Sequence, residues 1–209
     1  MKREFDPEAQ AMFGEDYLQH YAGDRGPDDP DSILSPEEIF GDLAAAGVEL
    51  AGKRVLDIGS GPGRYVQLFR RRGALAFGID ISEAALAKAS AEVRPYLYHL
   101  DMENLEIFPA NSFDLALHNA AVYLQPEALS AHFREVARIL SDHLYLHVIA
   151  SDHPFFQALD RQRYAPYPGR PTDWWVKTVE TAGFTLNKIF DHPGWSWWML
   201  FKKKGEEKK

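Results

Sequence analysis

The stretch VLDIGSGPGRYV, residues 55 to 66, constrains the fold of this chain more than any other. Its apolar start predicts a buried strand. Three glycines, Gly59, Gly61 and Gly63, then follow at every second position before a helical pattern opens. Glycines between a strand and a helix let the backbone approach a ligand, and the amides at a helix N-terminus favour an anion. The stretch therefore predicts a nucleotide-binding turn.

Short apolar runs alternate with helical patterns from residue 53 onward. Strands are expected at 53–58, 74–79, 96–100, 113–118, 143–150, 184–190 and 195–201, and helices at 62–72, 82–93, 126–140 and 172–183. Such alternation implies right-handed crossovers and a parallel sheet covered on both faces. A link of four residues, 191–194, makes the last two strands an antiparallel hairpin. The predicted fold class is α/β: a doubly wound, mainly parallel seven-stranded sheet with an antiparallel C-terminal hairpin strand and helices on both faces.

Local signals fix several helix ends. Capping and proline rules predict helix starts at Ser35-Pro36, Ser82, Pro126 and Thr172, and glycine rules predict helix ends at Gly47, Gly73 and Gly183.

The acidic, Gly- and Pro-rich stretch 23–32 divides the chain. Residues 1–34, with a helix around 7–19, are expected to form an N-terminal cap segment and a mobile acidic loop. Residues 35–203 are expected to form the main domain, with 151–171 as a lid or substrate loop, and 204–209 to fray.

Composition excludes several function classes. The formal net charge is −8, whereas dedicated nucleic-acid binders are usually basic. The chain has no cysteine, which excludes disulfides, Cys-ligated zinc and a thiol nucleophile. The N-terminus is charged and no apolar run approaches the ~18 residues that span a bilayer. We therefore expect a cytoplasmic protein without membrane segments, a monomer or homodimer.

Two ligand classes compete for the glycine turn. A dinucleotide fold would place a third glycine where Arg64 stands. Asp80, 21 residues after Gly59, suits a ribose under either interpretation. Asp57, just ahead of the glycines, is unfavourable beside a pyrophosphate but suits an ammonium group. A ligand that carries an ammonium group is therefore favoured over a dinucleotide.

Four segments in succession resemble the motifs of Rossmann-like (class I) S-adenosylmethionine-dependent methyltransferases. They are VLDIGSGPGRY, GIDIS (78–82), LDMENL (100–105) and FDLALHNAAVYL (113–124). The resemblance runs from about residue 53 to 150, and the terminal hairpin extends it to about 203. It implies S-adenosylmethionine as the cofactor.

The resemblance also implies residue roles. The turn beneath the methionine part and the ribose would be formed by Gly59, Ser60, Gly61 and Gly63. Asp57 would orient that turn or reach the amino group through water, and Asp80 would hold the ribose hydroxyls. The adenine would contact Ile81, Asp101 and Met102, and the backbone of His118 and Asn119 would take the methionine amino group. An N-terminal tyrosine, Tyr21 or Tyr17, would close over the cofactor.

His118 and His153 are the candidates for a general base. They follow the fourth and fifth predicted strands, and the ligand crevice of an open parallel sheet lies beyond the carboxyl ends of its strands. Three Asp-His pairs recur, but adjacent residues in extended chain point to opposite sides, so no metal site is expected. His143, Tyr145 and His147 share one strand face and are expected to form a hydrogen-bonded polar layer.

The acceptor class follows from the segment after the fourth strand. DNA base methyltransferases usually carry Asn/Asp-Pro-Pro-Tyr/Phe there, whereas this chain has HNAAVYL, which resembles the small-molecule type. A departure is Ser141-Asp142 in place of the usual Pro-Gly-Gly turn. The methyl acceptor itself stays open. Two alternatives also stay open: a non-catalytic cofactor- or partner-binding relative, and an NAD(P)-dependent oxidoreductase.

Overall fold

The computed structural model describes residues 36–154, 156, 169–192 and 197–205. The chain divides between Asn104 and Leu105 into two compact units. The seven strands belong to one mixed sheet, with the order β3-β2-β1 in the first unit and β4-β5-β7-β6 in the second. The predicted fold class is therefore confirmed.

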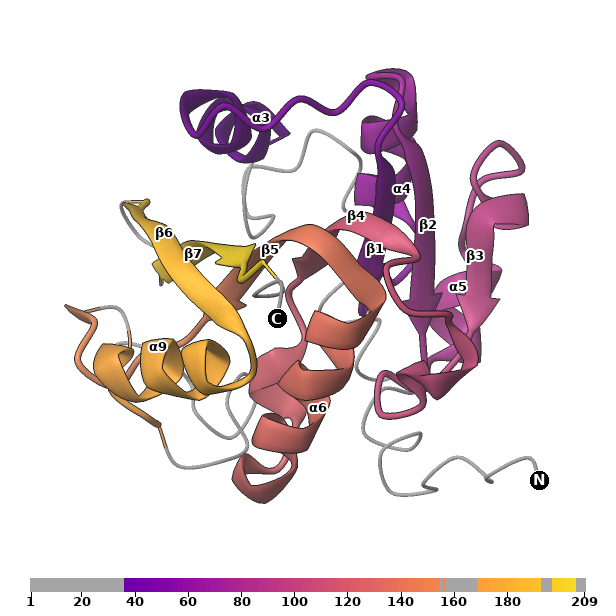
Figure 1. The fold of residues 1–209 in the computed structure, drawn as a ribbon. Coiled ribbons are helices and arrows are strands. Elements are labelled where there is room, and N and C mark those ends of the chain that lie inside the picture. Colours follow the sequence, from indigo (N-terminus) through magenta and orange to yellow (C-terminus); the bar gives the residue numbers. More distant parts are fainter. Residues whose placement is uncertain (1–35, 155, 157–168, 193–196, 206–209) are drawn as a thin grey trace. The chain divides into compact units, whose positions relative to one another are not determined.

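The first unit is a parallel three-stranded layer with helices. Its strands are β1 (Arg54–Ile58), β2 (Leu75–Asp80) and β3 (Leu97–His99), and its helices are α3 (Pro36–Ala45), α4 (Arg64–Arg71) and α5 (Glu83–Ala87), with the 3-10 turn η1 (Arg94–Tyr96) (Figure 1). Phe40 of α3 packs edge-on against Phe69 of α4, with ring centroids 5.3 Å apart. The helix ends predicted at Gly47 and Gly73 are confirmed, because both glycines have left-handed φ angles of 74° and 82°.

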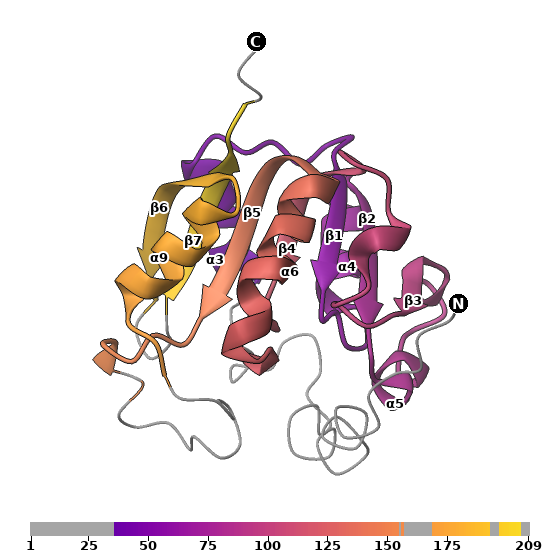
Figure 2. The ribbon, with the colours of Figure 1, turned by 60° about the horizontal axis from the view of Figure 1, so that its bottom comes forward.

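The second unit joins a parallel strand pair to an antiparallel hairpin. Its elements are η2 (Leu105–Ile107), β4 (Phe113–His118), η3 (Ala121–Tyr123), α6 (Pro126–Ile139), β5 (Leu140–Val148), α9 (Thr172–Thr181), β6 (Phe184–Asp191) and β7 (Trp197–Lys203). Strands β4 and β5 are parallel, and β7 is antiparallel to both β5 and β6. Helices α6 and α9 lie together on one face of these strands (Figure 2).

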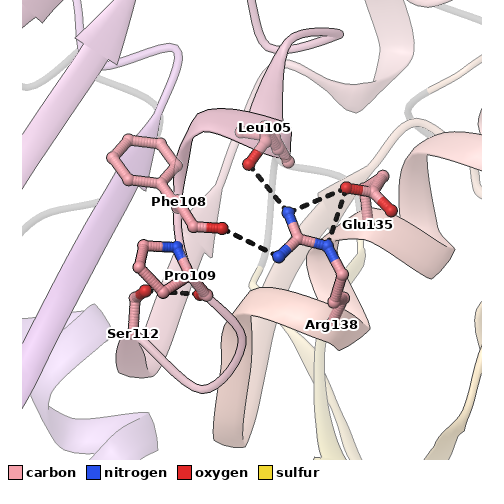
Figure 3. Close-up of polar contacts among 6 residues, drawn as sticks. All are labelled: Leu105, Phe108, Pro109, Ser112, Glu135 and Arg138. Carbon is pink, nitrogen blue, oxygen red and sulfur yellow. Dashed lines mark hydrogen bonds and ion pairs between the residues drawn. The ribbon is translucent and has the colours of Figure 1, made fainter.

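Arg138 of α6 fastens the segment before β4 to the body of this unit (Figure 3). Its guanidinium donates to the carbonyls of Leu105 at 2.9 Å and Phe108 at 2.8 Å, and pairs with Glu135 at 2.9 Å. Three acceptors satisfy the donors of one side chain, so the loop between η2 and β4 is tied to α6.

Predicted features of the helix after β2 and of the last helix are wrong. The helix expected at 82–93 ends at Ala87, because the Arg94 guanidinium donates to the carbonyls of Ala87 at 2.8 Å and Ala89 at 3.0 Å and so satisfies groups that another turn would use. Thr172 is not the cap of the last helix. It is the first residue of α9, and Asp152 instead accepts from its amide at 2.9 Å and its hydroxyl at 2.8 Å. The cap predicted at Ser82 is confirmed, since its Oγ accepts from the amide of Ala85.

The face of β5 that carries His143, Tyr145 and His147 holds an aromatic stack. The ring of Trp198 lies 4.8 Å from that of Tyr145 and 4.9 Å from that of His147. Burial lowers the pKa of His147 to about 3, so this imidazole is neutral. His143 pairs with Asp142 at 3.1 Å.

Several predicted features lie outside the described residues. They are the cap segment with its helix around 7–19 and its acidic loop, Tyr17 and Tyr21, the cap at Ser35, most of the loop 151–171, the turn of the hairpin and most of the tail. Within the described residues no helix is long and apolar enough to cross a membrane.

Candidate functional site

The glycine turn after β1 depends on left-handed backbone. The φ angles are 80° at Gly59, 53° at Gly61 and 82° at Gly63, a region that residues with a Cβ rarely adopt. The amides of Gly59 and Ser60 donate to the carbonyl of Ile79 at 2.9 and 3.0 Å, which ties the turn to β2. Helix α4 starts only after the last of these glycines, so the predicted start at residue 62 is two residues early.

Asp80, the last residue of β2, organises this turn. One carboxyl oxygen accepts from the amide of Gly61 at 2.7 Å, and the other accepts from the amide of Ser82 at 2.8 Å. Burial raises the pKa of Asp80, while these two hydrogen bonds and nearby His99 act to lower it. The structure thus places on Asp80 the turn-orienting contact that the resemblance offered to Asp57.

Asp57 is buried, with only 2 % of the residue exposed. Neither of its carboxyl oxygens has a hydrogen-bond donor among the described residues. Burial, and secondly the charge of Asp80, raise the pKa of Asp57 to about 8. Ligand-free Asp57 is therefore mostly protonated at neutral pH. A buried carboxyl without a partner is complementary to a cationic donor, such as the ammonium group of S-adenosylmethionine.

Space around the turn is uneven. A Cβ at Gly61 would meet no heavy atom within 4 Å, whereas one at Gly63 would lie 2.8 Å from Leu97 and one at Gly78 would lie 2.6 Å from Ser60. Gly63 and Gly78 are therefore close-packing positions, and the turn is open at Gly61, where a ligand could reach the backbone.

The predicted adenine-binding residues follow β2 and β3 in the same unit. The amide of Leu100 donates to the carbonyl of Asp80 at 3.0 Å, so the tips of β2 and β3 lie together. Asp101 accepts from the amide of Glu103 at 2.9 Å, and both Asp101 and Met102 are half-buried. Ile81 is half-buried as well, and its carbonyl contacts Nε2 of His99 at 2.9 Å.

His118 ends β4 in the second unit and is fully buried. Its Nε2 lies 2.8 Å from Nε2 of His132 on α6, and its Nδ1 accepts from the amide of Ala120 at 3.4 Å. A neutral His118 that accepts at Nδ1 carries its proton on Nε2, so it donates to His132. The next residue, Asn119, has its buried side-chain oxygen without a donor among the described residues.

His153 follows β5 and is also buried, at 6 % exposure. Its Nε2 lies 3.5 Å from a carboxyl oxygen of Asp191 at the end of β6, and its ring meets the ring of Trp197 edge-on at 4.6 Å. A histidine beside a carboxyl group has the composition of a general base and its orienting acid.

Two partners of these histidines were missed from the sequence. His132 had a usable signal: it lies at helical spacing with Leu129, Phe133 and Val136, on the buried face of α6. Asp191 had none, because only the pairing of β6 with β7 brings it to His153.

The described residues hold no cluster of three or more His, Cys, Asp or Glu side chains suited to a metal ion.

A family model described as a methyltransferase domain matches residues 55–143. The matched residues start inside β1, four positions before the first glycine of the turn, and end within β5. Residues 55–143 therefore match a methyltransferase domain, and this match, with the strand order, confirms the predicted resemblance to the Rossmann-like, S-adenosylmethionine-dependent methyltransferases.

One curated relative is a ubiquinone biosynthesis O-methyltransferase of Acinetobacter baumannii. It is 32% identical over 114 residues, which cover 54% of this chain and 46% of the relative. The chain thus spans less than half the length of this relative.

Solved structures share the fold. The magnesium protoporphyrin IX methyltransferase of Synechocystis PCC 6803, with bound SAH, aligns with a TM-score of 0.72 at 17% identity over 95% of this chain and 99% of that one. The 1,6-didemethyltoxoflavin-N1-methyltransferase of Burkholderia thailandensis, with bound 1,6-didemethyltoxoflavin and S-adenosylhomocysteine, aligns with a TM-score of 0.68 at 21% identity over 98% and 93%.

Proposed function

We propose that this protein binds S-adenosylmethionine and transfers its methyl group directly to a small-molecule acceptor. When bound, the cofactor supplies a sulfonium methyl group, which is already a strong electrophile. The chain then has to hold the cofactor, position the acceptor in line, exclude water and, for an oxygen nucleophile, receive a proton. Positioning of this kind can supply about 7–11 kcal/mol of the barrier.

The observation that carries the proposal is Asp57. A pyrophosphate has no hydrogen to donate to the two buried oxygens of Asp57, which have no donor among the described residues, whereas an ammonium group can donate to them. A dinucleotide ligand therefore leaves Asp57 unexplained, and a methionine-type amino group explains it.

The remaining cofactor contacts are proposed from the resemblance and are consistent with the geometry of the first unit. Asp80 keeps lone pairs for ribose hydroxyls while it accepts from Gly61 and Ser82. The open position at Gly61 would admit the methionine part of the ligand. Ile81, Asp101 and Met102 would line the adenine.

Two further cofactor contacts are proposed from the resemblance alone. The backbone at His118 and Asn119 is proposed for the amino group, as in the resemblance. As a base we favour His153, because a carboxyl oxygen of Asp191 lies 3.5 Å from its Nε2 and could orient the ring, whereas both ring nitrogens of His118 already contact neighbouring groups.

A small-molecule acceptor is supported by the relatives and by charge. The names of the matched ubiquinone, protoporphyrin and toxoflavin enzymes all refer to small molecules. The net charge of −8 disfavours a nucleic acid.

Two measurements test the proposal. Calorimetry with S-adenosylmethionine, S-adenosylhomocysteine and NAD should show binding of the first two only; binding of NAD alone would overturn it. Release of S-adenosylhomocysteine is then followed over a panel of small metabolites, which also identifies the acceptor. Cofactor binding without turnover of any acceptor would favour the non-catalytic alternative.

A further inference from the structure

Arg170 is held in place at the carboxyl end of β5. Its backbone forms a parallel bridge with Ala150, and its carbonyl accepts from the amide of Ser151 at 2.9 Å. Two residues later α9 begins, where Asp152 accepts from the amide of Thr172 at 2.9 Å. The chain on both sides of this arginine is therefore fixed.

The guanidinium of Arg170 has no hydrogen bond or ion pair among the described residues. Its carbon lies 5.3 Å from the ring centroid of Trp174, and its Nε is buried without an acceptor among the described residues. No carboxylate of the described residues forms an ion pair with it. By contrast, Arg138 in the same unit satisfies two carbonyls and Glu135.

The buried Nε–H group of Arg170 lowers the stability of the folded state unless a ligand supplies an acceptor for it. A buried N–H without an acceptor is a net loss in the folded state, and a guanidinium stays protonated at every pH where the protein is folded. The fixed backbone and the aromatic ring nevertheless hold the side chain in one place. A pre-organised cation of this kind is suited to an anionic ligand.

The ligand's charge and shape follow from the surroundings. In the described parts of this segment, 150–154 and 169–174, the other charged side chains are the acids Asp152 and Asp173, so no second cation lies beside Arg170 among these residues. One planar guanidinium can donate two parallel hydrogen bonds to the two oxygens of a carboxylate, whereas a phosphate dianion usually requires more positive charge.

We propose that Arg170 binds a carboxylate of the methyl acceptor, so that the substrates of this protein are carboxylic acids. The position agrees with this, because ligands of open α/β sheets bind beyond the carboxyl ends of the strands. This inference rests on the proposed function, since the ligand in question is the acceptor.

The test compares acids with their neutral amides. Benzoate, salicylate and indole-3-acetate, each beside its primary amide and with phenyl phosphate as a further probe, are titrated into the full chain saturated with S-adenosylhomocysteine, and affinity is measured by NMR. At least one acid should bind about tenfold or more tightly than its amide.

Variants locate the effect. Arg170→Met keeps an apolar stem beside Trp174 and should abolish the preference for the acid, a loss of about ten- to hundredfold, while Arg170→Lys should retain part of it. Arg134→Met, an exposed arginine on α6 with no hydrogen bond or ion pair among the described residues, removes the same charge and should leave the preference unchanged.

The outcomes separate the two proposals. If no acid binds more tightly than its amide, if Arg170→Met weakens acid and amide equally, or if phenyl phosphate is preferred to every acid, the carboxylate assignment is wrong. Binding of S-adenosylmethionine by the Arg170→Met variant is measured in parallel. Failure of the wild-type chain to bind that cofactor would instead count against the proposed function.

Discussion

Asp57→Asn is expected to make the ligand-free protein more stable at neutral pH and to weaken cofactor binding. The folded pKa of Asp57 is about 8 and its ordinary value is 3.8. Between these values the folded chain holds a proton that the unfolded chain has lost, so the free energy of unfolding falls as pH rises. The slope is at most about 1.36 kcal/mol per pH unit. From pH 4 to pH 7 the accumulated loss is therefore at most about 4 kcal/mol.

Asparagine cannot ionise and so removes this loss. The two proteins should be similarly stable near pH 4, and the variant should gain on the wild type by up to about 3 kcal/mol between pH 5 and pH 7. Urea unfolding at half-unit pH steps measures the difference. Glu49→Gln, a change to an exposed loop carboxyl in the same unit, is the matched control and should give a flat difference. A flat or shrinking difference for Asp57→Asn would refute the reasoning.

Cofactor binding should reverse the protonation of Asp57. An ammonium group beside the carboxyl favours its ionised form, so binding at pH 7 releases up to one proton. Calorimetry in buffers of different ionisation enthalpy should show this release for the wild type and not for Asp57→Asn. The same release from the variant would mean that another group is responsible.

Three further experiments test the turn and the contacts that hold η2 to α6. Asp80→Asn should weaken S-adenosylmethionine binding by about 1–3 kcal/mol, through weaker hydrogen bonds to the ribose and to the Gly61 amide, as measured by calorimetry; wild-type affinity would contradict the ribose assignment. Gly63→Ala places a Cβ against Leu97 at a residue with a left-handed φ, and should lower the free energy of unfolding in urea by about 2–4 kcal/mol. Gly61→Ala has no such contact and should lower it by about 1 kcal/mol, but should weaken cofactor binding. Equal losses of stability would contradict the expected difference in packing at the two glycines. Arg138→Met should lower stability by about 1–3 kcal/mol by leaving carbonyls without donors (Figure 3), and Arg134→Met should change it little; equal effects would show that the fastening is unimportant.

The alternation of strands and helices was sufficient to predict the fold. Short apolar runs that alternate with helical patterns predicted all seven strands and the mainly parallel arrangement, because a buried parallel strand has few polar positions to obscure its signal. The shortening of the helix after β2 was not predictable, since it depends on Arg94 folding back onto carbonyls that precede it. Helix propensity alone favours continuation there.

The cofactor motif could be read because it is local. Gly59, Gly61 and Asp57 lie within five residues, so strand and turn rules place them together. The contacts around His118 and His153 could not be read in this way. His132 reaches His118 from a separate helix and Asp191 reaches His153 from a separate strand, and single-sequence patterns do not specify which side chains meet across elements.

The glycines of the turn can meet two separate requirements, a left-handed backbone conformation and open space beside the backbone. All three adopt left-handed φ angles, so conformation alone would explain the pattern without any ligand. The surroundings separate them, because Gly63 is filled by Leu97 while Gly61 faces open space and donates its amide to Asp80. A turn that served only as a connection would need neither this open backbone nor a buried carboxyl that lacks a donor among the described residues. Both features agree with the proposed ligand, and packing among the described residues explains neither.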